Sequence, residues 1–260
     1  MSAIEFPVDY DESYVAFIGV LGFSALTQQN TRESRVKIQK YIELTAALVR
    51  SFKAGRFSVI FVSDSLILSV RESEMGDLVP LCELVGSIQR SLLDHLGFLS
   101  RGAISMGPAF VKSNEFQFFG PAIVRAVELE KQSAIYPRVI LDPMILKGTT
   151  RTRLVQTTRT SDKNKSPLLM SAQTQDFRGK FLNSDHFLFV DYLAECCRKL
   201  NRDFMNHLYS IIQDGLSGNV KNIIKYQWMK DYVIACLTMH IDRDDKSGFY
   251  DDFSNRFGEL

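Results

Sequence analysis

Two short apolar segments limit what this chain can fold into. The first is a continuous run of β-forming residues over 14–21, which ends at the turn Gly22-Phe23-Ser24. A run that is apolar at every position is typical of a strand buried on both faces. The second segment, 57–70, has the length of two strands joined by a tight turn, with Asp64 at its tip. The sequence therefore predicts a sheet with a glycine turn and an acidic hairpin.

The pattern over the rest of the first half alternates helices and strands irregularly. This order is typical of an α+β fold with an antiparallel-rich sheet and helices on one face, and it is too irregular for a doubly wound parallel fold. Apolar spacing and glycine stops predict helices over 33–52, 78–96 and 120–133, and strands over 101–111, 116–119 and 138–142.

The second half changes character at residue 147. Residues 147–185 are rich in Thr, Ser, Lys, Arg and Gln and lack periodicity, which indicates a long basic loop. A short strand at 187–190 and two helical stretches over about 191–214 and 219–241 follow. We expect a first domain over 1–185, with its core at 14–145, and a helical C-terminal extension over 186–260 that packs on the core.

Charge and cysteine content exclude several classes of partner. The chain has 31 basic and 30 acidic residues, so the overall balance favours neither nucleic acid nor an anionic membrane. No segment reaches the roughly 18 apolar residues that span a bilayer. The 4 cysteines lack CxxC spacing, which indicates free thiols in a reducing compartment. We expect a cytoplasmic protein.

Four motifs stand in a fixed order along residues 14–145. They are the turn Gly19-Val-Leu-Gly-Phe-Ser24, the hairpin with Asp64, the strand from Arg101 to Gly107, and the helix led by Phe119-Gly120-Pro-Ala-Ile-Val-Arg-Ala-Val-Glu-Leu-Glu130. Each motif is weak alone, but the four in this order resemble the class III nucleotidyl cyclase catalytic domain.

The resemblance implies a catalytic site for a nucleoside triphosphate and two divalent cations, Mn²⁺ or Mg²⁺. Asp64 would bind both ions, the Val20 backbone would add a ligand, and position 19 should supply a second carboxylate. The family also implies a head-to-tail homodimer with active sites across the interface. The triphosphate would lie on backbone groups of the glycine turn, formed by Val20, Leu21, Gly22, Phe23 and Ser24.

Gly19 is the main departure from the family, because glycine has no side chain to bind a metal. An altered copy made to trap one state and a naturally silent homologue both explain it. A substitute ligand from Asp9, Asp11 or Glu12 is less favoured, since an extended strand would place these residues roughly 25 Å away. In each of the first two cases this copy is inactive, and a non-catalytic nucleotide-binding or interaction domain is the alternative function.

Two other positions bear on the choice of base. In the family, two side chains recognise the purine base, and the matching positions here are Ile60 and Gln117. The polar pairs that select adenine or guanine are absent from these two positions. A glutamine amide both donates and accepts, which suits uracil or cytosine. The chain also resembles the bacterial pyrimidine cyclases of the Pycsar antiphage system. That resemblance implies UTP or CTP as substrate, and a cyclic UMP or cyclic CMP product that activates a separate effector protein.

The remaining candidate residues have weaker assignments. The family's transition-state arginine aligns with Glu128, so Arg125 either reaches the phosphates instead or pairs with Glu128 on one helix face. Arg101 is expected to have a structural or dimer-contact role. The basic residues between Lys147 and Lys165 are either a phosphate-binding flap or a solvated loop. The 4 histidines show no metal-ligand spacing.

Overall fold

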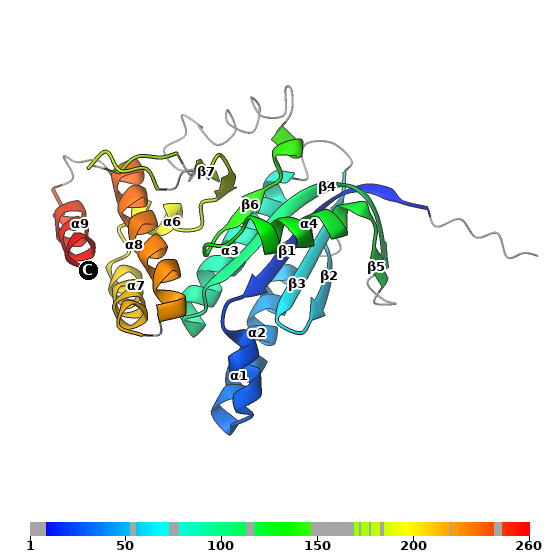
Figure 1. Cartoon of the computed structure of the whole chain (residues 1–260), viewed down its shortest axis with the longest axis horizontal. Coiled ribbons are helices and arrows are strands. Elements are labelled where there is room, and N and C mark those ends of the chain that lie inside the picture. Colours follow the sequence, from blue (N-terminus) through cyan, green and yellow to red (C-terminus); the bar gives the residue numbers. More distant parts are fainter. Residues whose placement is uncertain are drawn as a thin grey trace, which may run out of the picture.

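The computed structural model is a mixed α+β fold built on one sheet, with a group of helices beside it (Figure 1). No described helix is long and apolar enough to cross a membrane. The basic stretch 147–165 lies outside the described residues. The structure describes residues 9–52, 56–72, 78–112, 117–146, 169–171, 173–176, 178–182, 185–218, 220–241 and 246–260.

The strands form one sheet of mixed direction. Its order is β2-β3-β1-β4-β6-β8-β7, and β5 pairs with β4 off this path. All described pairs are antiparallel except β4 with β6. The antiparallel-rich sheet is therefore confirmed. The strands are β1 (Asp11–Val20), β2 (Ser58–Val62), β3 (Ser65–Arg71), β4 (Ser100–Lys112), β5 (Gln117–Phe119), β6 (Val139–Leu141), β7 (Leu169–Ser171) and β8 (Leu188–Val190).

The helices of the first half match the predicted ranges closely, whereas those of the second half differ. The predicted helix over 191–214 is broken in two, and the helices over 23–29 and 249–259 were not predicted. The described helices are α1 (Phe23–Gln29), α2 (Arg32–Ser51), α3 (Leu78–Leu96), α4 (Pro121–Gln132), the 3-10 helix η3 (Pro143–Leu146), α6 (Ala194–Arg198), α7 (Arg202–Leu216), α8 (Val220–His240) and α9 (Phe249–Glu259).

Helices cover both faces of the sheet, which corrects the expectation that they lie on one face. Alternate residues of β1 point to opposite faces. Ala16 and Ile18 pack in a core cluster with α2 and α3, whereas Val15 packs with α4 in a separate cluster. The physical reason is visible in the sequence of β1, because a strand that is apolar at every position needs cover on both sides.

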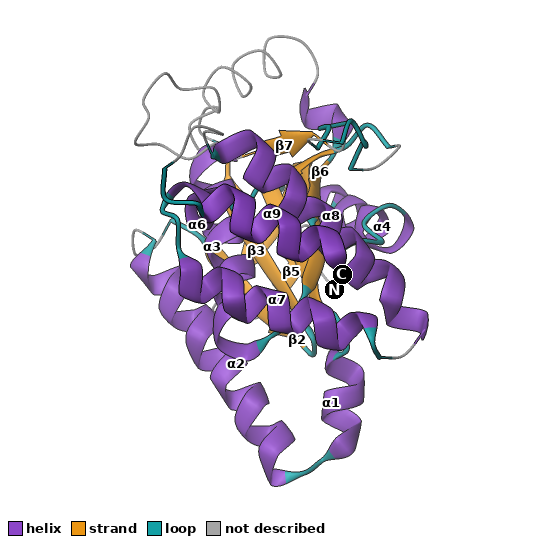
Figure 2. Cartoon of the chain, turned by 90° about the vertical axis from the view of Figure 1, so that its left-hand side faces the viewer, coloured by secondary structure: helices purple, strands orange, loops and turns teal. Residues whose placement is uncertain are grey.

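The C-terminal helices continue the core rather than standing apart from it. One hydrophobic cluster joins Ala103 of β4 and Ile140 of β6 to Trp228 and Val233 of α8. Figure 2 shows α7, α8 and α9 in front of the sheet, on its β7 side. The C-terminal helices and the sheet therefore share one hydrophobic core.

Candidate functional site

The end of β1 meets the tip of the β2–β3 hairpin. Gly19 lies opposite Ser65 in the antiparallel register. The backbone N–H of Val20 donates a hydrogen bond to the carbonyl oxygen of Asp64 at 3.1 Å. Ser63 has a φ of 57°, a left-handed conformation that makes the hairpin turn tight. The structure therefore brings together Gly19, Val20 and Asp64, as the sequence predicts.

The turn after β1 is held by the core on one side. Gly22 has a φ of 80°, which favours glycine, and α1 begins at the next residue. Phe23 is buried and packs edge-on against the ring of Tyr41 at 5.2 Å. The Leu21 N–H donates to the Leu99 carbonyl at 2.8 Å. The amides of Val20 and Leu21 are therefore used within the sheet. The first amides of α1, including Ser24, have no acceptor within a helix.

Tyr41 of α2 lies under this junction. Its hydroxyl is buried and has no hydrogen-bond partner among the described residues. Burial raises the pKa of Tyr41 well above its usual value, and the negative charge of Asp64 raises this pKa further. The phenol is therefore neutral beside the hairpin carboxylate.

A carboxylate missed by the sequence reasoning lies beside position 19. A Cβ atom at Gly19 would be 3.6 Å from Glu130 Oε1 and 4.0 Å from Ser65 Oγ. Glu130 is on α4 and is buried. It forms an ion pair with Arg101, with 2.7 Å between Glu130 Oε1 and Arg101 Nε. The sequence could have indicated that Glu130 is buried, because it follows the buried Ala122 and Ala126 at helical intervals.

A second basic group lies near this ion pair. The pKa of Lys225, on α8, is lowered by burial and by the positive charge of Arg101. The space at Gly19 therefore borders one carboxylate and is near two basic groups. The structural role expected for Arg101 agrees with this ion pair.

Arg125 makes a different contact from either that the sequence suggested. Its Nε and Nη2 donate to the Asp142 carboxylate at 2.7 and 3.2 Å. Asp142 is 3% exposed and also accepts from the Met144 N–H. This hydrogen bond raises the pKa of Arg125, and Glu128 contributes only a weaker charge effect. Pairing with Glu128, one of the two alternatives for Arg125, is therefore corrected, because Arg125 pairs with the buried carboxylate of Asp142 instead.

Arg125 also lies away from the Gly19 junction within one chain. It precedes Glu130 by 5 residues on α4, which is roughly 7.5 Å along the helix axis. The two side chains also leave the helix in different directions. Arg125 therefore does not share the pocket of Gly19 in the same chain.

The two base-recognition candidates lie in different surroundings. Ile60 is 8% exposed and packs in the cluster with Val15 and Ile67, so it offers an apolar wall and no hydrogen bond. Gln117 is exposed on β5 and pairs with Lys112. Lys112 is eleven residues beyond Arg101 on β4, roughly 35 Å in a straight strand. One chain does not bring Gln117 to Asp64.

The atoms around the junction can be tested for a divalent cation. The Asp64 carboxylate, the Val20 carbonyl and Glu130 are oxygen donors, which suit Mg²⁺ or Mn²⁺. A Cβ atom at Gly19 would make only ordinary contacts, so a side chain can begin there without backbone movement. The donor types present suit a hard cation, and an aspartate at position 19 would add a carboxylate to them.

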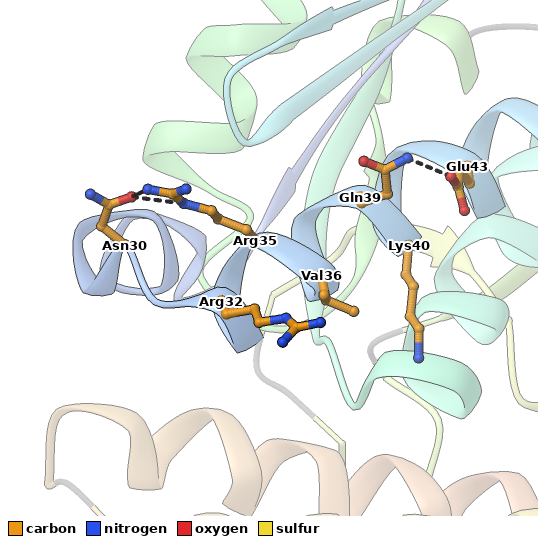
Figure 3. Close-up of a pocket in the computed structure, with 7 residues that line it drawn as sticks. All are labelled: Asn30, Arg32, Arg35, Val36, Gln39, Lys40 and Glu43. Carbon is orange, nitrogen blue, oxygen red and sulfur yellow. Dashed lines mark hydrogen bonds between the residues drawn. The ribbon is translucent and has the colours of Figure 1, made fainter.

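The two described cavities of the surface lie elsewhere. A groove of about 570 Å³ runs along the outer face of α2 (Figure 3), where Arg35 bonds to Asn30 and Gln39 to Glu43. A smaller one of about 360 Å³ lies between α7 and α8. None of the predicted site residues lines either cavity. The first is lined by Asn30, Arg32, Arg35, Val36, Gln39, Lys40 and Glu43.

Comparison with known proteins gives a likeness in solved structures alone. No family model matches the chain. No curated protein matches it either. The adenylyl cyclase CyaB from P. aeruginosa is similar at 12% identity and a TM-score of 0.48, over 71% of this chain and 96% of that one.

Two further solved structures are similar to the same degree. A bacterial light-regulated adenylyl cyclase has 14% identity and a TM-score of 0.45, over 71% of this chain and 92% of that one. The guanylate cyclase domain of RhGC from Catenaria anguillulae, in complex with GTP, has 11% identity and a TM-score of 0.44, over 70% and 96%. At identities and TM-scores this low, the activities of these enzymes do not transfer to this chain.

Proposed function

We propose that this chain is built as a nucleotidyl cyclase of the class III kind, which forms a 3′,5′-cyclic monophosphate and pyrophosphate from a nucleoside triphosphate. The observation that carries the proposal is the junction of β1 with the hairpin. There, the bond from Val20 N–H to the Asp64 carbonyl and the register of Gly19 with Ser65 bring the motif residues together. Val20 and Asp64, 44 residues apart in the chain, thus meet in one acidic site next to a glycine turn.

The chemistry assigns a role to each of these residues. The Asp64 carboxylate and the Val20 carbonyl would hold the cation, and the turn from Gly22 to Ser24 would contact the triphosphate through its backbone. A bound Mn²⁺ or Mg²⁺ pair would neutralise the phosphate charge and make the ribose 3′-oxygen nucleophilic. Tyr41, which is buried under the junction, keeps the hairpin and α2 together through its ring contact with Phe61.

The proposed substrate class rests on Gln117 and Ile60. An amide that donates and accepts suits the edge of UTP or CTP, and Ile60 adds no polar group that would select a purine. The product would be cyclic UMP or cyclic CMP, a second messenger of antiphage defence that acts on a separate effector in the cytoplasm.

A homodimer is part of the proposal because one chain is incomplete. Gln117 is about 35 Å along β4 from the strand position that faces Gly19, and Arg125 points away from it. In a two-fold dimer, each site could combine Asp64 of one protomer with Gln117 and Arg125 of its partner.

Gly19 bears on whether this copy turns over substrate. Glu130 is the nearest carboxylate, but Arg101 neutralises it at 2.7 Å. This favours a second candidate function, a cyclase-like domain that binds a nucleotide without chemistry. An altered copy and a naturally silent homologue both predict that position 19 limits the activity.

The proposal is tested with the wild-type protein and the Gly19→Asp variant. Each is incubated with ATP, GTP, UTP and CTP in the presence of Mn²⁺, and cyclic products are measured by mass spectrometry. We expect Gly19→Asp to form cyclic UMP or cyclic CMP at a rate at least 100-fold above that of the wild type, since loss of a metal ligand should exceed the ~10 to 100-fold cost of an outer-shell change.

Two controls make the test specific. Gly19→Asn has nearly the same size but no charge, and Gly19→Asp with Asp64→Asn lacks the hairpin carboxylate; neither should be active. Mn²⁺ should raise the melting temperature of Gly19→Asp more than that of Gly19→Asn, because it screens the new carboxylate from Glu130. Purine products alone would overturn the pyrimidine assignment. Nucleotide binding without turnover in Gly19→Asp would support the binding domain instead.

A further inference from the structure

A second cluster of metal-ligating side chains lies in the core, among the C-terminal helices. Asp191 directly follows β8, and Cys236 and His240 are one turn apart on α8. One ligand atom from each of the three lies within 4.8 Å of the others. Asp191 Oδ2 is 2.8 Å from His240 Nε2, and Asp191 Oδ1 is 3.5 Å from Cys236 Sγ. The three side chains converge from two separate elements.

Further contacts orient this cluster. The Tyr232 hydroxyl donates to Asp191 Oδ1 at 2.7 Å, which fixes the rotation of the carboxylate. The Cys236 thiol also lies near that of Cys197, on α6.

No permanently charged group among the described residues pairs with the Asp191 carboxylate. The Asp191 side chain is 0% exposed and that of His240 is 3% exposed. In the described part of the chain, the hydrogen-bond donors to this carboxylate are Tyr232, Cys236 and His240, and none carries a permanent positive charge. A buried carboxylate without a cation is costly. A cation in the cluster would remove that cost.

We propose that Asp191, Cys236 and His240 bind a zinc ion. Mixed sulfur, nitrogen and carboxylate donors suit Zn²⁺, whereas Mg²⁺ and Mn²⁺ prefer oxygen alone. Tetrahedral ligands at 2.0–2.3 Å from zinc are roughly 3.3–3.8 Å apart, so Cys236 Sγ and Asp191 Oδ1 already have a suitable separation. As zinc enters, the Cys236 thiol loses its proton to solvent.

The site has the character of a structural rather than a catalytic centre. The side chains of Asp191 and His240 are 0% and 3% exposed and Cys236 is buried, so the ion would be closed off from a substrate in solvent. It would join the end of β8 to α8, between the sheet and the C-terminal helices that Figure 1 shows beside it. Zinc would thus fasten these helices to the sheet, and this role does not depend on the proposed cyclase activity.

The experiment measures metal in the full-length protein purified without a metal-affinity tag. We expect one zinc per chain by elemental analysis, and a thiolate charge-transfer band in the near ultraviolet after replacement with Co²⁺. Cys236→Ser and His240→Gln should each lose the metal and bind zinc more than ~100-fold less tightly, since both remove a direct ligand. Removal of zinc by a chelator should lower the melting temperature, and added zinc should restore it.

Matched controls separate this site from any other. Cys82→Ser removes a thiol that is equally buried but lies on α3, and Asp64→Asn removes the hairpin carboxylate; both should keep the zinc. If Cys236→Ser does not fold, the Co²⁺ spectrum of the wild type still decides. Absence of the thiolate band in the wild type, or zinc retained by both Cys236→Ser and His240→Gln, would overturn the proposal.

Discussion

Gly19 shows how much a single position depends on its neighbours in space. A Cβ atom there would lie 3.6 Å from Glu130 Oε1, a residue that follows it by more than a hundred positions. Arg125 makes the same point, because its partner Asp142 lies 17 residues further along the chain, just after β6. Motif alignment therefore identifies which residues could act. Whether each side chain is available to bind a ligand depends on the charged groups that surround it.

Close packing at Gly102 yields a prediction at the same scale. A Cβ atom there would clash with the Phe17 carbonyl oxygen, where β4 pairs with β1. The backbone cannot give way cheaply, so Gly102→Ala should lower the free energy of unfolding by about 3 kcal/mol. Urea unfolding measures the change.

The matched control for this substitution is Gly258→Ala on α9. A Cβ atom at Gly258 meets nothing within 4 Å, so we expect a change of less than about 1 kcal/mol. Equal stability of Gly102→Ala and the wild type would contradict the close approach of the two strands.

At the scale of elements, apolar spacing predicted the helices correctly where the pattern of apolar and polar residues is regular. The predicted helix over 78–96 matches α3 at both ends. The predicted helix over 191–214 is instead broken between α6 and α7, where Leu200 has a φ of 50° and Asn201 caps α7. The apolar spacing continues across this break, so periodicity alone does not reveal it.

The cap of α7 can be tested directly. The Asn201 side chain accepts a hydrogen bond from the Phe204 N–H at 3.1 Å. Asn201→Ala leaves that amide without its cap and should cost about 1 kcal/mol of stability. Asn201→Asp keeps an accepting oxygen and should retain nearly all of the wild-type stability. Unfolding curves that do not separate the two variants would show that the cap does not hold the break.

The whole molecule combines a sheet covered on both faces with a C-terminal layer that shares its core. Trp228 and Tyr232 of α8 pack in one hydrophobic cluster with Ile140 of β6 and Phe189 of β8. The separation of Gln117 from Asp64 along β4 is a property at this scale, because it is set by strand length and pairing.

This separation leads to a prediction about assembly. If a working site takes Asp64 from one protomer and Gln117 from its partner, the protein should be a homodimer at micromolar concentration. Light scattering coupled to gel filtration should give twice the mass of one chain. A monomer at that concentration, for the wild type and for Gly19→Asp alike, would argue against shared sites.

The sequence by itself determined the α+β class, the main helices of the first half, and the joining of the glycine turn to the Asp64 hairpin. Those features depend on residue patterns within short segments, where apolar period and turn residues act locally. Only the tertiary structure decided that helices cover both faces, that Glu130 and Arg101 border Gly19, and that Asp191 meets Cys236 and His240. These contacts join residues far apart in the chain, and their partners depend on how the elements pack rather than on any local pattern.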